Sequence, residues 1–173
     1  MKSRPFGSLR TPVSEVGVGT WQFGGDWGNV TDKDAVNAVL AAMDAGVTFI
    51  DTADVYGAGR SEQLIGQALK QRFGSGQKRE NIFIATKLGR LHGYPDGYSL
   101  DLFRKCCEDS IKRLGVDALD LTQTHCIPHE LVADGEVFDW LRTLKKEGLI
   151  KRFGASVESM DEALDCLKHA GSG

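Results

Sequence analysis

Short runs of apolar and β-branched residues alternate along the chain with longer segments in which apolar residues recur every three or four positions. The short runs predict strands, and the amphipathic segments that follow them predict helices. The five predicted strands are Val16–Thr20, Val47–Asp51, Ile82–Lys87, Leu119–His125 and Arg152–Ser156. Because strands and helices that alternate with a repeat of about 30 to 37 residues are typical of βαβ units, the sequence predicts an α/β fold with a parallel sheet.

Each predicted helix carries one apolar stripe that is expected to pack on the sheet. The stripes are Val36, Val39, Leu40 and Met43, then Leu64, Ile65, Ala68 and Leu69, then Phe103, Cys107, Ile111 and Leu114, then Val137, Phe138, Leu141 and Leu144, and finally Ala163, Leu164 and Leu167. Thr31 and Ser159 are predicted N-caps, the second in a capping box with Glu162, and glycines follow the helices as C-cap signals. Residues 4–13 contain two prolines and a glycine, which predicts an irregular or hairpin segment that closes one end.

Composition indicates an ordinary globular protein. The chain has 173 residues, 41% hydrophobic and 26% charged, with a formal net charge of -3. These values suit one domain over residues 1–173, and the scattered charges form no basic stripe for nucleic acid or for a membrane surface. Because no spanning helix or signal-type run is visible and the four cysteines form no C-x-x-C pair, we expect a cytoplasmic protein with reduced core thiols.

Four of the predicted strands end in a polar or reactive side chain, namely Asp51, Lys87, His125 and Ser156. In parallel β/α architectures the carboxyl ends of the strands point to a common face, so these side chains are expected to converge there. Tyr56 follows the second strand closely and would join them. Together these residue types supply acid and base chemistry, and the sequence therefore predicts one active site.

The residues around these strand ends resemble the aldo-keto reductase family in order and spacing. The matching positions are Gly19 to Trp21, Phe49 to Gly57, Ser61 with Glu62, Ile65 with Gly66, Thr86 with Lys87, and Asp120 to His125. The resemblance extends over essentially the whole chain. It implies a (β/α)8 barrel of TIM-barrel type, NADPH or NADP+ as cofactor, and reduction of small aldehydes or ketones to alcohols.

The resemblance also implies a catalytic tetrad of Asp51, Tyr56, Lys87 and His125. Physical chemistry supports these roles, because hydride delivery to a carbonyl creates an alkoxide that must take up a proton, and Tyr56 is the natural donor. A lysine cation about 4 Å away would stabilise the phenolate that remains. Asp51 would hold the Lys87 ammonium in place, and His125 would orient the substrate carbonyl.

Further positions are expected to bind the cofactor and the substrate. The cofactor-binding positions are Thr20, Asp51 and Ser156. Ser156 falls where the family places a serine that bonds the nicotinamide carboxamide, although the adjacent asparagine of the common family pattern is Val157 here. Trp21 and Trp27 are expected to form an apolar wall for the substrate, since aromatic rings supply much contact area.

No metal site is expected. His125 and His129 are four positions apart with Cys126 between them, a spacing that invites a zinc interpretation. The segment follows a strand and contains Pro128, so the two histidines would not share a helix face. The histidine pair therefore does not predict a metal site.

Chain length leaves alternatives open. A (β/α)8 barrel usually needs about 250 residues, so this sequence is expected to hold about five of eight units. The outer strands would then lack neighbours, which predicts self-association through unpaired barrel edges. Two other readings are a non-catalytic truncated barrel fragment that acts only through self-assembly, and a redox-sensing regulatory subunit.

Overall fold

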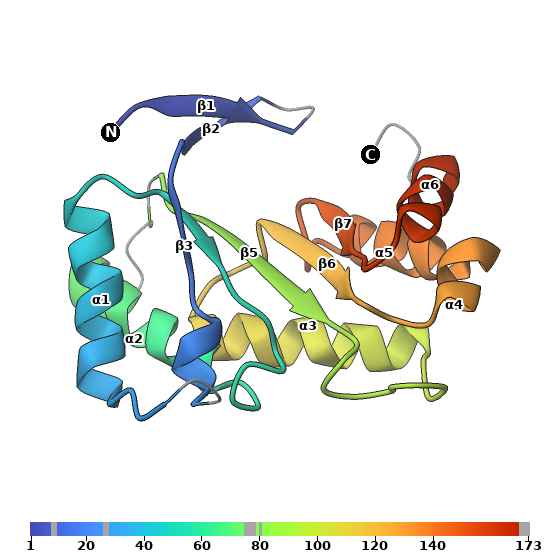
Figure 1. The fold of residues 1–173 in the computed structure, drawn as a ribbon, viewed down its shortest axis with the longest axis horizontal. Helices are drawn as coiled ribbons and strands as arrows, with labels where there is room; N and C mark the ends of the chain where they lie inside the picture. The colour runs from blue at the N-terminus through green and yellow to red at the C-terminus, as the bar shows by residue number, and fades with distance from the viewer. Residues whose placement is uncertain (8–9, 26–27, 75–78, 80, 170–173) are drawn as a thin grey trace.

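The computed structural model describes residues 1–7, 10–25, 28–74, 79 and 81–169 (Figure 1). A parallel sheet contains β3 (Gly17–Gly19), β4 (Phe49–Asp51), β5 (Phe83–Leu88), β6 (Leu121–His125) and β7 (Phe153–Ser156), neighbours in chain order. The main helices are α1 (Asp32–Asp44), α2 (Arg60–Phe73), α3 (Leu100–Leu114), α5 (Glu136–Lys146) and α6 (Met160–His169). The predicted α/β class with five βα units is therefore confirmed. Two short helices were not predicted, η1 (Trp21–Gly24) and α4 (His129–Asp134).

An antiparallel hairpin of β1 (Ser3–Phe6) and β2 (Thr11–Ser14) precedes the sheet, which confirms the hairpin alternative for residues 4–13. Figure 1 shows it across the end of the sheet at which β3 begins. Its Phe6 ring packs edge-on against Phe49 and Phe83, with centroids 5.6 and 5.4 Å apart. The hairpin thus covers apolar side chains at the amino ends of the strands.

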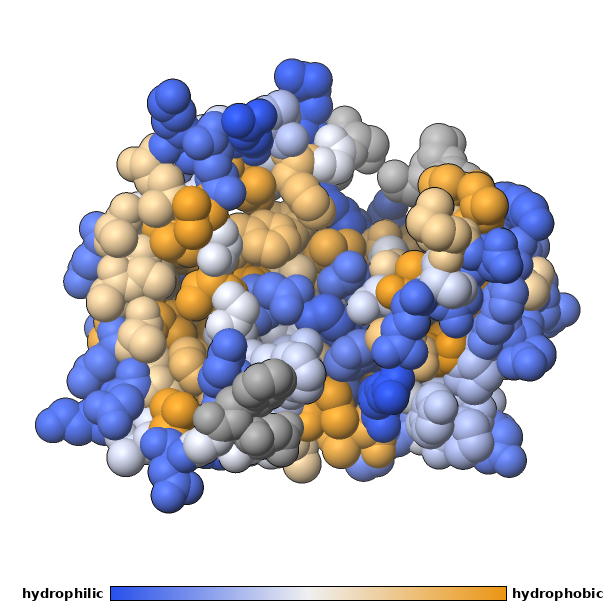
Figure 2. Space-filling view, in the orientation of Figure 1, coloured by the Kyte–Doolittle hydropathy of each residue, from blue (hydrophilic) through white to orange (hydrophobic). Residues whose placement is uncertain are grey.

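The two faces of the sheet differ because side chains alternate along each strand. The face toward the helices contributes Ile50, Ile84 and Leu88 to the main core. The opposite face carries the small apolar cluster of Val13, Phe83, Ala85 and Leu121 near the hairpin. Figure 2 shows a surface that is polar at the centre of the viewed side and apolar toward the hairpin.

Parallel register places the predicted site residues on this second face. Asp51 pairs with Ala85, and Lys87, two residues further along β5, pairs with Gln123. His125, two residues beyond Gln123, pairs with Ser156. Since residues two apart point to the same side, Asp51, Lys87, His125 and Ser156 all project from one face at the carboxyl ends of the strands.

Both predicted helix starts are confirmed. The Thr31 hydroxyl accepts a hydrogen bond from the Asp34 backbone N–H at 3.1 Å. At the start of α6 the Ser159 hydroxyl accepts from the Glu162 N–H at 3.2 Å, and the Glu162 carboxylate accepts from the Ser159 N–H at 2.9 Å. This reciprocal pair is the capping box that the sequence predicted.

The expectation that the stripe of the last helix packs on the sheet is wrong. Leu164 and Leu167 are 53% and 75% exposed, and α6 has no fully buried residue. The helix lies beside the edge strand β7 and packs against α4, so in the described part of the chain it has no second neighbour over this stripe. Self-association through the edge strands β3 and β7 stays a prediction.

None of the described helices is both long and apolar enough to cross a membrane. All four cysteines are free thiols. Cys106 and Cys107 are buried on α3, where burial raises the pKa of the Cys106 thiol to about 11. Cys106 and Cys107 thus have the core position that the sequence predicted, whereas Cys126 and Cys166 are only partly buried. That these thiols are reduced stays a prediction.

Candidate active site

A tight loop after β4 positions Tyr56. The Asp54 backbone N–H donates to the Lys87 carbonyl at 3.0 Å, which ties this loop to the end of β5. Gly57 has a φ of 60°, and a Cβ there would lie 2.8 Å from the Gly24 Cα. The close approach of η1 to the loop therefore requires glycine, which explains why glycine follows the tyrosine in this sequence.

Lys87 lies at the centre of the predicted tetrad. Its side chain is 10% exposed, and its ammonium donates to Asp51 Oδ1 at 2.7 Å and to the Thr52 carbonyl at 2.9 Å. The third contact is with the Tyr56 hydroxyl at 3.4 Å. The structure therefore brings Asp51, Lys87 and Tyr56 into one chain of polar contacts.

His125 approaches the tyrosine from β6. Its ring lies edge-on to the Tyr56 ring, with centroids 5.9 Å apart. Burial lowers the pKa of His125 to about 4, and the positive charges of Lys87 and Arg90 act in the same direction. The imidazole is therefore neutral near pH 7. Its Nδ1 is buried and has no hydrogen-bond partner among the described residues.

Trp21 forms the opposite side of the site. Its ring stacks on Tyr56 with a centroid distance of 6.0 Å and an interplanar angle of 20°. Trp21 is 48% exposed, so an apolar ring face borders the tyrosine at the surface. Trp27, the other predicted wall residue, lies outside the described residues.

The predicted cofactor-binding residues differ in their surroundings. Thr20 is fully buried, and its hydroxyl donates to the Asp51 carbonyl at 2.9 Å and accepts from Ser61 at 2.7 Å. Ser156 is partly exposed, and its hydroxyl lies 3.9 Å from the Cys126 sulfur. Thr20 therefore supports the strand that carries Asp51, while contact of either residue with a cofactor stays a prediction.

Two features of the site were missed from the sequence. The Thr52 carbonyl accepts a hydrogen bond from Lys87, but a backbone acceptor leaves no sequence signal. Arg90 lies close enough to influence His125, and its position just after the strand end was the available signal. His129, which a zinc interpretation would pair with His125, instead contacts Asp165 Oδ2 at 2.8 Å.

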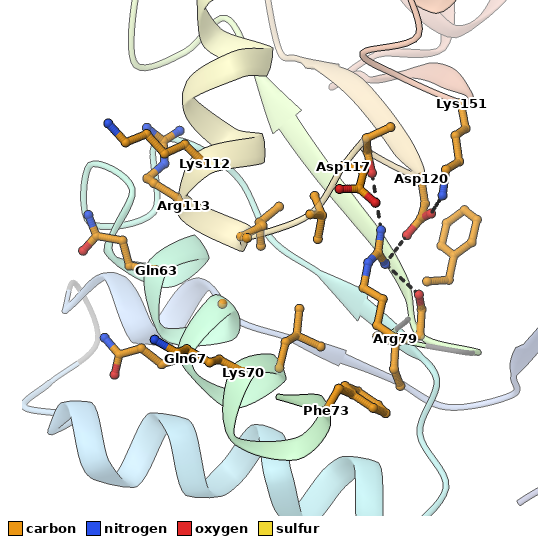
Figure 3. Close-up of a pocket in the computed structure, with 18 of the residues that line it drawn as sticks. Gln63, Gln67, Lys70, Phe73, Arg79, Lys112, Arg113, Asp117, Asp120 and Lys151 are labelled. Atoms are coloured by element: carbon orange, nitrogen blue, oxygen red, sulfur yellow. Dashed lines mark hydrogen bonds and ion pairs between the residues drawn. The ribbon is translucent and has the colours of Figure 1, made fainter. Parts of the chain in front are cut away.

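A hollow of about 1420 Å3 lies elsewhere, at the amino ends of the strands (Figure 3). Gln63, Gln67 and Lys70 line it from α2, and Lys112 and Arg113 line it from α3. Its lining includes none of the predicted tetrad. The predicted tetrad therefore lies at the opposite ends of the strands, outside this hollow.

Known sequences match the chain along nearly all of its length. A model of the Aldo/keto reductase family matches residues 15–172. The aldo-keto reductase YhdN of Bacillus subtilis is 37% identical over 161 residues, which cover 86% of this chain and 46% of that protein. The 6-dehydroglucose reductase of Novosphingobium aromaticivorans is 35% identical over 172 residues, 96% of this chain and 54% of that protein. The chain thus spans about half the length of the curated relatives it matches.

Solved structures of aldo-keto reductases also match the chain along nearly all of its length. The holo form of aldo-keto reductase AKR11C1 from Bacillus halodurans superposes with a TM-score of 0.80 at 32% identity, covering 98% of this chain and 54% of that one. An aldo-keto reductase from Klebsiella pneumoniae in complex with NADPH has a TM-score of 0.77 at 27% identity, with 99% and 55% covered.

Proposed function

Because the chain belongs to the aldo/keto reductase family, we propose that it acts as an oxidoreductase that reduces aldehydes or ketones to alcohols with NADPH. The observation that carries the proposal is the Lys87 ammonium, which contacts both Asp51 and the Tyr56 hydroxyl. An acid beside a buried cation is what carbonyl reduction needs, since the carbonyl oxygen becomes negative as the hydride arrives at carbon.

Tyr56 is the proton donor in this proposal. As the new C–H bond forms, the carbonyl π electrons move to oxygen, which takes the proton from the Tyr56 hydroxyl and completes the alcohol. The phenolate that remains lies 3.4 Å from the Lys87 ammonium, which stabilises it. Asp51 holds that ammonium at 2.7 Å and prevents it from turning away.

His125 orients the substrate in this proposal and does not supply the proton. With its pKa lowered to about 4 by burial and nearby cations, the ring is neutral near pH 7 and carries no extra proton to release. A neutral imidazole can still donate one N–H to a carbonyl oxygen. Its edge-on position beside Tyr56 supports this role, because a carbonyl oxygen bound at the Tyr56 hydroxyl would also lie near the imidazole.

NADPH is the proposed cofactor, because the proposed reduction needs a hydride donor and the site offers polar groups that could bind one. When bound, the reduced nicotinamide supplies the hydride. Ser156 is a suitable partner for its carboxamide, because the serine projects from the face that carries the tetrad and is partly exposed. Asp51 and Thr20 are proposed to border the same cofactor. One relative is named an NADH-specific methylglyoxal reductase, so NADH is the natural comparison in a binding assay.

The substrate is proposed to be a small carbonyl compound that packs against Trp21, whose exposed ring stacks on Tyr56. Trp27 is proposed as a second part of this wall. An aromatic ring beside the acid favours a substrate with an apolar or aromatic portion, since such contacts bury surface without requiring polar partners.

The test is a Tyr56→Phe substitution with NADPH oxidation followed by absorbance. General acid catalysis typically contributes a factor of about 10² to 10⁴, so kcat should fall by roughly that amount. The dissociation constant for NADPH, measured by fluorescence, should change little because the hydroxyl acts on the substrate.

Tyr94→Phe is the matched control, because Tyr94 is exposed and its hydroxyl has no hydrogen bond in the described structure. This variant should retain the kcat of the unmodified chain. If Tyr56→Phe retained the full rate, Tyr56 would not be the donor. If the unmodified chain failed to oxidise NADPH with every aldehyde and ketone of a broad panel, the proposed activity would be wrong for this chain.

A further inference from the structure

A second cation lies at the same end of the sheet as the tetrad. Arg90 follows the last residue of β5, Leu88, by two positions and begins the long loop that leads to α3. Its side chain is exposed, unlike the nearly buried Lys87. It therefore stands at the surface of the proposed active site and takes no part in the internal ion pair of the tetrad.

The backbone around Arg90 is fixed from two sides. The Gly89 carbonyl accepts a hydrogen bond from the Tyr98 hydroxyl at 3.0 Å, which ties the start of the loop to its far end. Gly89 has a φ of 101°, and a Cβ there would lie 3.0 Å from the Ile127 side chain. The loop thus begins in close contact with the segment that follows β6.

The guanidinium is also held in position. Its Nη1 donates to the Cys126 carbonyl at 3.4 Å, and its Cζ lies 5.2 Å from the centre of the Tyr94 ring. Cys126 directly follows His125, so this contact places the cation beside the histidine that faces Tyr56. The lowering of the pKa of His125 by Arg90 agrees with this placement.

Charge pairing separates Arg90 from Lys87. The Lys87 ammonium is paired with Asp51 at 2.7 Å. Within the part of the chain that the structure describes, Arg90 has no carboxylate within 4.0 Å, and its contacts are the Cys126 carbonyl and the Tyr94 ring. A guanidinium has five N–H donors in a planar fork, so most of them are available for an anion.

We propose that Arg90 is a specificity-determining residue that binds the carboxylate or phosphate group of an anionic carbonyl substrate. The proposal rests on the function proposed above and narrows its substrate class. A guanidinium beside the group that orients the carbonyl would hold the far end of such a substrate while Tyr56 faces its reacting end. Bidentate geometry suits both carboxylate and phosphate oxygens.

The experiment compares benzaldehydes that carry an anionic or a neutral group at the para position of the ring. The anionic substrates are 4-carboxybenzaldehyde and 4-formylphenyl phosphate, and 4-formylbenzamide is the neutral partner. We expect the unmodified chain to prefer at least one anionic aldehyde. Arg90→Met should lower kcat/KM for that aldehyde roughly ten- to a hundredfold, as for loss of a charge-assisted hydrogen bond, through KM and not kcat.

The neutral aldehyde should react equally well with Arg90→Met, and Arg90→Lys should keep part of the preference because it retains the charge. Arg72→Met is the matched control, an arginine on α2 that pairs with Asp44 and does not belong to this site. Comparing the two anions distinguishes carboxylate from phosphate recognition. Equal kcat/KM for charged and neutral aldehydes, or an equal loss of both in Arg90→Met, would overturn the proposal.

A binding assay separates this inference from the proposed activity. Ligand-observed NMR titration of 4-carboxybenzaldehyde and 4-formylbenzamide, without NADPH, reports binding whether or not turnover occurs. Weaker binding of the anion alone in Arg90→Met would support the anion site even if the chain reduced no aldehyde. The inference would be overturned if the unmodified chain did not bind the anion, or if Arg90→Met bound it equally well. Either result would count even if the chain were an active reductase.

Discussion

A buried carboxylate beneath the proposed active site, Glu62, gives a sharp test of how the proposed tetrad is supported. Its side chain is fully buried on the first turn of α2. One oxygen accepts from the Thr86 hydroxyl at 2.6 Å, and the other accepts from Arg113 Nε at 2.7 Å and from the Ser110 hydroxyl at 3.2 Å. Since Thr86 directly precedes Lys87, this network joins α2 and α3 to the strand that carries the lysine.

The perturbation is Glu62→Gln, which preserves the size of the side chain and removes its charge. The new amide group can face Thr86, whose hydroxyl can reverse its direction, so the main loss is the ion pair with Arg113. Arg113 is 18% exposed and would keep its charge without an anionic partner. Breaking such a pair from one side should cost about 3 kcal/mol of unfolding free energy.

The assay is thermal and urea unfolding followed by circular dichroism. For a domain of this size, about 3 kcal/mol corresponds to a fall in Tm of about 8 °C. Asp109→Asn is the control, because Asp109 forms an exposed i,i+4 pair with Lys105 at 3.2 Å, and such pairs contribute at most about 1 kcal/mol. If Glu62→Gln shifted Tm no more than this control, the buried ion pair would not support the fold as argued.

A double substitution refines the same reasoning. Glu62→Gln combined with Arg113→Met removes both charges, so no unpaired cation remains near the core. The double variant should lose less stability than the sum of the two single variants, with a coupling of about 1 kcal/mol or more. Strict additivity of the single effects would show that Glu62 and Arg113 act independently.

Two further predictions concern the stability of the fold. Burial raises the pKa of Asp54 from 3.8 to about 7, so the folded chain holds this proton more tightly than the unfolded chain does. The free energy of unfolding should therefore fall as the pH rises from about 4 to 7. Asp54→Asn should therefore gain stability relative to the unmodified chain at pH 8 but not at pH 4, in paired urea titrations, and an equal difference at both values would contradict this assignment. Gly66→Ala would place a Cβ 2.3 Å from the Arg113 carbonyl, so it should destabilise by about 1 to 3 kcal/mol, whereas the exposed neighbour Gln67→Ala should change Tm little. A Gly66→Ala variant as stable as the Gln67→Ala control would show that α2 and α3 can separate freely.

The sequence by itself determined the order and type of the main elements. Apolar periodicity follows directly from backbone geometry, so five strands and five helices could be predicted without any long-range information. Local capping was equally accessible, because the hydrogen bonds of Thr31 and of the pair Ser159 and Glu162 join residues within one turn. The short helix α4 was missed, since six residues leave too little periodic signal.

The gathering of site residues at one end of the sheet was also predictable, because parallel strands end at a common face. The distances between these side chains could not be predicted from the sequence. Lys87 meets Asp51 and Tyr56 because β4 and β5 pair in one particular register and because the loop after β4 bends back over the end of β5. The sequence fixes no such register, which depends on how the whole sheet packs.

Tertiary structure alone decided which charges are buried and which surfaces are open. Glu62 looks like an ordinary helix-start carboxylate in the sequence but is enclosed by three donors from β5 and α3. Leu164 and Leu167 look like core residues but are exposed, because α6 lies beside an edge strand. Arg90 becomes a candidate for substrate recognition only when the loop after β5 meets Cys126. Burial is a property of neighbours distant in the sequence, so periodicity reveals which face of an element is apolar but not what covers it.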